Sequence, residues 1–179
     1  MSVVLANHQR ARKINLHLLR QITDSLLAEL KIQNAGLEIN FVTTKAMKLL
    51  NKKFLQHAGS TDVITFDYAD NVGQAARRFP KPLGRKTDKR DARPAVHGEI
   101  FICMDEAVGQ ARKFRTSWQS ETVRYLVHGV LHLLDYDDSR PGDRRKMKQA
   151  ENRLLRRFSR RFSLAQLERV TRLSPCKSH

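Results

Sequence analysis

Two histidines, His128 and His132, stand four residues apart in a stretch whose apolar pattern predicts a helix from residue 116 to 134. On a helix this spacing places both imidazoles on one face, about one turn apart. Two nitrogen ligands of a single metal ion need such a separation. Asp138 follows just past the predicted end of the helix, where a returning chain brings its carboxylate back. The sequence therefore predicts a metal site formed by His128, His132 and Asp138.

Three protein ligands predict a catalytic site, because they leave one position on the metal open to water. Zinc lowers the pKa of bound water towards about 7, which provides a hydroxide nucleophile. His128 and His132 would then be catalytic through that water. The spacing alone is weak in a chain with seven histidines, and two helix histidines in structural roles are the alternative.

Gly129 separates this stretch from the H-E-x-x-H motif of zinc proteases, because it occupies the position of their catalytic Glu. A protease is therefore disfavoured. Glycine within a helix costs about 1 kcal/mol relative to alanine. That cost suggests that another group, such as a substrate, approaches the helix closely at Gly129.

The formal charge of +16 on 179 residues favours a polyanionic partner. Nucleic acid is preferred to an anionic membrane, because cationic side chains set against phosphates release counterions. A basic surface without any polyanion is the other reading. The RNA-binding candidates are Lys52, Lys53, Arg77, Arg78, Arg85, Lys86, Lys89, Arg90 and Arg124.

Residues 69–95 contain three prolines, many basic residues and little that could build a core. This composition predicts a mobile basic loop inserted in a single domain of residues 1–162, which a C-terminal tail, 163–179, follows. The loop could be a solvated linker or an arm that lies along RNA. Composition leaves both interpretations open.

Alternating and helical hydrophobic patterns predict an α+β fold, with a small mixed sheet of about four strands and helices packed around it. The predicted strands are residues 3–6, 37–41, 63–66 and 97–103. The predicted helices are residues 11–32, a second starting at Thr43 or Thr44, 104–114, 116–134 and 141–162. Asn34 and Gly36 are expected to end the first helix, and Thr116 with Gln119 to form a capping box for the fourth.

The two cysteines, Cys103 and Cys176, form no disulfide framework, which favours a reducing, cytoplasmic compartment. The apolar start of the chain is too short for a signal peptide, and no stretch is apolar enough to span a bilayer. We therefore expect a cytoplasmic protein without a membrane partner.

The run from His128 to Asp138 resembles the motif H-G-x-L-H-L-x-G-Y-D-H of the YbeY family. Residues 50–54 and 61–66 resemble the family's L-N-x-x-[FY] and T-D-V-L-S-F segments, and residues 98–100 its G-D-I. The resemblance implies a metal-dependent, single-strand endoribonuclease with a zincin-like helix that bears the histidines. It also implies one zinc ion, ribosomal RNA or its precursor as substrate, a role in ribosome maturation, and ribosomal proteins as further partners.

Three positions depart from the family pattern. Asp138 replaces the third His, and this carboxylate can bind zinc but also suits manganese or iron. Asp135 replaces a Gly and is among the residues that tolerate a left-handed turn. Leu55 replaces an Arg that would contact the RNA phosphate. Two other functions are alternatives to the endoribonuclease. One is a non-catalytic RNA-binding factor in ribosome biogenesis. The other is a hydrolase of another phosphoester, which the high positive charge disfavours.

Overall fold

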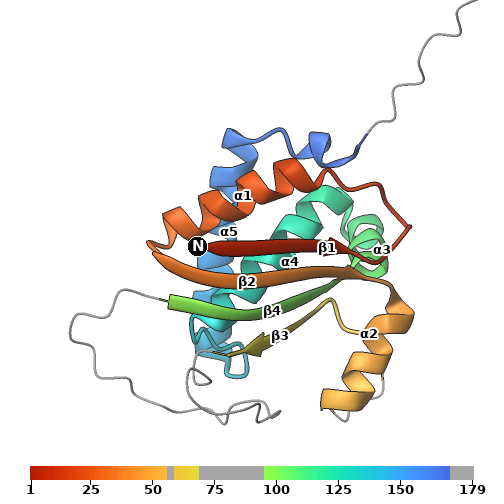
Figure 1. The fold of residues 1–179 in the computed structure, drawn as a ribbon, viewed down its shortest axis with the longest axis horizontal. Helices are drawn as coiled ribbons and strands as arrows, with labels where there is room; N and C mark the ends of the chain where they lie inside the picture. The colour runs from red at the N-terminus through yellow and green to blue at the C-terminus, as the bar shows by residue number, and fades with distance from the viewer. Residues whose placement is uncertain (56–58, 69–94, 170–179) are drawn as a thin grey trace, which may run out of the picture.

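The fold is built on one four-stranded mixed sheet, as the sequence predicts (Figure 1). The computed structural model describes residues 1–55, 59–68 and 95–169. The strands are β1 (Ser2–Asn7), β2 (Asn34–Val42), β3 (Val63–Asp67) and β4 (Ala95–Cys103). Their order across the sheet is β1-β2-β4-β3, with β3 antiparallel to β4 and the other pairs parallel.

Helices surround this sheet, which makes the protein α+β (Figure 1). They are α1 (Leu16–Glu29), α2 (Thr44–Leu50), α3 (Met104–Phe114), α4 (Trp118–Leu133) and α5 (Pro141–Arg161). A π-helical turn, η1 (Asn51–Leu55), continues α2, and a 3-10 turn, η3 (Leu164–Leu167), follows α5. None of the helices among the described residues is long and apolar enough to cross a membrane.

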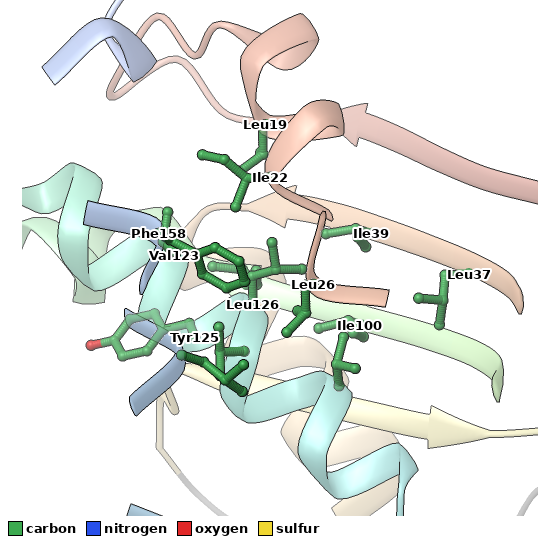
Figure 2. Close-up of a cluster of buried hydrophobic side chains, with 14 of the residues drawn as sticks. Leu19, Ile22, Leu26, Leu37, Ile39, Ile100, Val123, Tyr125, Leu126 and Phe158 are labelled. Carbon is green, nitrogen blue, oxygen red and sulfur yellow. The ribbon is translucent and has the colours of Figure 1, made fainter. Parts of the chain in front are cut away.

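The main core lies between the sheet and the helices α1, α4 and α5. Figure 2 shows Ile22 of α1, Ile39 of β2, Leu126 of α4 and Phe158 of α5 in this cluster. Each of these side chains is at most 2% exposed. A smaller cluster, around Met47, joins α2 to the other face of the sheet. The helix that bears the histidines is therefore fixed on its apolar side by the central sheet and by two other helices.

The first helix is shorter than the sequence predicts. It starts at Leu16 because the side chain of Asn15 accepts a hydrogen bond from the backbone N–H of Leu18. It ends before Lys31, whose φ of 58° breaks the helical path. The expectation that Asn34 and Gly36 end this helix is wrong, because both residues lie in β2.

The predicted capping box of the fourth helix is also wrong. Ser117 is the N-cap, and its hydroxyl accepts from the backbone N–H of Ser120. The hydroxyl of Thr116 instead donates to Glu121 Oε1 at 2.7 Å. Glu121 is 6% exposed, so this bond satisfies part of a buried carboxylate.

Residues 163–169 of the predicted tail pack against the start of α1. Leu167 is fully buried, and its carbonyl accepts from the backbone N–H of Asn15. The basic loop, with candidates Arg77, Arg78, Arg85, Lys86, Lys89 and Arg90, lies outside the described residues apart from Ala95, which begins β4. Cys176 also lies outside them, and Cys103 is a buried free thiol.

Another group does lie close to the helix at Gly129, as expected from the sequence, and among the described residues that group is the sheet. A Cβ at this position would lie 2.8 Å from Ile100 Cγ2 and 3.3 Å from Thr65 Cγ2. Ile100 is fully buried in β4, so it has no room to move away. Glycine therefore lets α4 lie close to β4 and β3 immediately beside His128.

We expect Gly129→Ala to lower the free energy of unfolding by about 1 kcal/mol, because overpacking of about 1–3 kcal/mol outweighs the gain in helix propensity. Gly109, exposed in α3, is the matched control, since a Cβ there meets no atom within 4 Å. Gly109→Ala should raise the free energy of unfolding by about 0.5–1 kcal/mol. Urea denaturation of both variants tests the prediction, and equal stabilisation by the two would contradict it.

Candidate metal centre

The structure brings together the three residues that the sequence predicts as metal ligands. His128 and His132 lie on α4, and Asp138 lies in the loop between α4 and α5. One candidate ligand atom from each residue lies within 4.8 Å of the other two. The two Nε2 atoms are 2.9 Å apart, and the ring planes are inclined by 86°. Two imidazoles and one carboxylate form a donor set that suits zinc and other divalent ions.

Each imidazole is held at its Nδ1 atom by an acceptor. His128 Nδ1 lies 3.1 Å from Glu151 Oε1 of α5, and His132 Nδ1 lies 3.0 Å from the carbonyl oxygen of Tyr136. Because both partners accept, we assign the proton of each ring to Nδ1. The two Nε2 atoms face each other at 2.9 Å, on the side of the rings where a metal ion would bind. Metal-binding histidines typically have this arrangement, in which an acceptor behind the ring sets its tautomer and orientation.

A left-handed turn brings Asp138 back to the histidines. Asp135 has a φ of 62°, and its backbone N–H donates to the carbonyl of His132. The structure thus bears out the suitability of Asp for this turn. The neighbouring carboxylate of Asp137 accepts hydrogen bonds from the backbone N–H and the hydroxyl of Ser139. Those bonds hold the pKa of Asp137 below its usual range, and Asp138 is the carboxylate that joins the cluster.

The environment shifts the two histidines in opposite directions. Burial lowers the pKa of His128, but the hydrogen bond and negative charge of Glu151 outweigh burial and leave that pKa raised. Burial lowers the pKa of His132, and the neighbouring His128 lowers it further. His132 is therefore uncharged at neutral pH, while Glu151 favours a proton on His128.

Comparisons with known proteins identify the family of this chain. The family model described as endoribonuclease YbeY matches residues 4–159. The chain belongs to the YbeY family. An endoribonuclease YbeY from Chlorobium luteolum is 33% identical over 79% of this chain and 93% of the relative. One from Chlorobium phaeovibrioides is 32% identical over 63% of this chain, and the match spans 61% of that relative's length.

The YbeY-family fold is also found in a solved structure. The solution structure of a Thermotoga maritima protein superposes with a TM-score of 0.60 at 19% identity. The superposition covers 96% of this chain and 99% of that protein. It supports the α+β assignment for the whole domain.

The guanidinium of Arg124, an RNA-binding candidate from the sequence, is engaged by protein groups. Its Nε lies 3.4 Å from Glu121 Oε2, and its NH1 lies 3.2 Å from Glu151 Oε2 and 3.1 Å from Asn152 Oδ1. Sequence reasoning missed these contacts. Glu121, Arg124 and His128 are spaced by three and then four residues, which signals one shared helix face, but nothing in the sequence pairs that face with Glu151.

Lys52 and Lys53, the other described RNA-binding candidates, are exposed on η1. Lys53 Nζ lies 5.3 Å from the centre of the Phe54 ring. Lys52 belongs to a shallow surface hollow of about 530 Å³, whose lining is Thr44, Lys45, Lys48, Leu49 and Lys52. This hollow and the histidine cluster have no residue in common.

We expect the turn at Asp135 to tolerate Gly and to reject a β-branched residue. Asp135→Val should lower the free energy of unfolding by about 1–2 kcal/mol, because a left-handed φ strains a β-branched side chain. Asp135→Gly should match or exceed the wild type, because glycine adopts this φ freely. Denaturant titrations measure both, and an Asp135→Val variant as stable as the wild type would contradict the prediction.

Proposed function

We propose that this protein is a metal-dependent, single-strand endoribonuclease that acts in ribosomal RNA maturation. The observation that carries the proposal is the cluster of His128, His132 and Asp138, in which both rings are held at Nδ1. Membership of the YbeY family, whose curated relatives are named endoribonucleases, supports RNA as substrate. The charge of +16 supports a polyanionic substrate as well.

The chain's own residues define what a metal would meet here. His128 and His132 would bind it through Nε2, and Asp138 through a carboxylate oxygen. Zinc is the ion that we propose, and the carboxylate of Asp138 makes manganese and iron the alternatives. A bound ion of this kind supplies a Lewis acid that lowers the pKa of water. The lowered pKa of His132 keeps its ring neutral, so that its Nε2 lone pair is available to the ion at neutral pH.

The lysine hollow on α2 and η1 is the described surface that we propose for RNA. Lys45, Lys48 and Lys52 recur at spacings of three and four, so they share one face, and all three are exposed. Leu49 lies between them and is 62% exposed, which offers an apolar contact to an unstacked base. Phosphates along a single strand would meet the lysines in turn.

A non-catalytic RNA-binding factor in ribosome biogenesis is the alternative. Leu55 favours it, because leucine cannot make the phosphate contact expected of the family's arginine. The two functions share the fold and the RNA surface. They differ in whether His128 is needed for cleavage.

We predict that purified protein binds about one metal ion per chain, as expected for a three-ligand site. Asp138→Ala should bind much less. His128→Ala should lose both metal and RNA cleavage while it still binds RNA, because His128 is not part of the lysine hollow. Elemental analysis, a cleavage assay on single-stranded RNA and a binding titration measure the three properties.

The matched control is His17→Ala, which removes an exposed histidine of α1 and should change none of them. Wild-type protein that takes up none of zinc, manganese and iron would refute the metal mechanism. Wild-type protein that binds RNA tightly but never cleaves it would favour the biogenesis factor.

We also predict that Lys48→Gln combined with Lys52→Gln weakens RNA binding and reduces the salt slope by about 1.4, since each phosphate contact on a single strand contributes about 0.7. The control is Lys31→Gln combined with Lys113→Gln, which removes the same charge from two other exposed sites. Binding titrations at several salt concentrations measure both slopes. Equal slopes for the two double variants would show that the hollow does not contact phosphates.

A further inference from the structure

Arg124 lies at the centre of a chain of polar contacts that leads to His128. Its guanidinium contacts Glu121 Oε2 through Nε at 3.4 Å and Glu151 Oε2 through NH1 at 3.2 Å. The other oxygen of Glu151, Oε1, lies 3.1 Å from His128 Nδ1. Glu151 thus uses one oxygen for Arg124 and the other for the imidazole.

The two carboxylates that contact Arg124 are nearly buried, so their pairing matters for the energy of the site. Glu121 is 6% exposed and Glu151 is 7% exposed, whereas the side chain of Arg124 is 29% exposed. Two nearly buried carboxylates that share no cation would repel each other and lack compensation for lost hydration. Arg124 lies between them, donating a hydrogen bond to Glu151 Oε2 and forming an ion pair with Glu121 Oε2. Its NH1 also donates to Asn152 Oδ1, one residue beyond Glu151 on α5.

Glu121 is itself held by a hydrogen bond from Thr116. Thr116 donates its hydroxyl proton to Glu121 Oε1 at 2.7 Å, so both oxygens of Glu121 have partners. Arg124 is therefore fixed by a carboxylate that cannot rotate freely. The order of contacts is Thr116, Glu121, Arg124, Glu151 and His128. Three of these residues, Glu121, Arg124 and His128, lie on α4, and Glu151 is contributed by α5.

We propose that Arg124, supported by Glu121, is a positioning residue for the metal centre: it fixes Glu151 so that Oε1 accepts the Nδ1 proton of His128 and Nε2 faces the metal position. The terminal torsion of a glutamate is soft, so one oxygen is fixed only when the other is held. This inference rests on the proposed metal function. It assigns Arg124 to the interior of the site and not to RNA.

The planar fork of arginine suits this task, because separate nitrogens reach the two carboxylates at once. The single ammonium group of lysine cannot reproduce both contacts. Arg124→Lys should therefore keep the charge and lose most of the positioning, whereas Arg124→Met removes both. Arg156→Met is the control, because Arg156 is exposed on the same helix as Glu151 and contributes to none of these contacts.

The first experiment uses the full-length, metal-free chain at alkaline pH, where His128 is neutral. Nitrogen-15 NMR of the imidazoles reports which ring nitrogen carries the proton. In the wild type and in Arg156→Met, we expect the Nδ1–H form of His128 to predominate. In Arg124→Met, the two tautomers should become mixed, since Glu151 is no longer held.

The second experiment measures zinc affinity by competition with a chelator. We expect Arg124→Met to bind zinc about 10- to 100-fold more weakly than wild type, the range found for groups that support a metal ligand. In the background of Glu151→Gln, Arg124→Met should cause little further loss, because its effect passes through Glu151. A purely structural role for Arg124 would give additive losses.

Several outcomes are decisive. An unchanged tautomer together with unchanged zinc affinity in folded Arg124→Met would overturn the positioning role while leaving the metal function intact. Additive losses in the double variant would overturn it as well. If the wild type binds no zinc but Arg124→Met alters the tautomer, the positioning holds and the proposed metal function fails. If Arg124→Met does not fold, Arg124→Lys decides, and wild-type tautomer and affinity in that variant would refute the proposal.

Discussion

The close contact between α4 and the sheet at Gly129 is the constraint on which the site depends. A Cβ there would lie 2.8 Å from Ile100 Cγ2, so any residue other than glycine would force the helix or the buried Ile100 side chain to shift. The neighbouring side chains of Val127 and Val130 are fully buried. Because these sides of α4 pack in the core, the position of His128 on the remaining face is fixed relative to β3 and β4.

That remaining face of α4 is polar, and it contacts α5 and not the sheet. Arg124 and His128 both contact Glu151, which α5 presents while its apolar residues, such as Leu154 and Phe158, enter the main core. The same packing therefore stabilises the fold and sets the acceptor behind His128. The second acceptor comes from the left-handed turn, whose carbonyl at Tyr136 lies against His132. In metal sites generally, groups that do not bind the metal fix the orientation of those that do, and these two acceptors could serve that role in the candidate site.

Much of the fold could be read from the sequence. The strands alternate clearly, and the predicted bounds of α3 match the structure, because its apolar period and the preceding buried strand are both unambiguous. The ends of α1 were harder, since they depend on contacts made elsewhere. At the start of α1, Ile14 pairs with Glu168, which is far along the chain. At its end, Lys31 has a positive φ, which the residue type lysine does not predict. Helix ends are decided by such local competition, which periodicity does not capture.

The sequence by itself determined the candidate ligands, their spacing on one helix and the turn that returns Asp138, because these features depend on residues within ten positions of one another. Only the tertiary structure decided the partners of Arg124 and the group that approaches Gly129. Arg124 and Glu151 are 27 positions apart, and Gly129 and Ile100 lie on different elements. From the sequence, the charge and helix position of Arg124 are compatible with any anionic partner. Which anion it meets is set by how α4 and α5 pack, and that depends on the whole core.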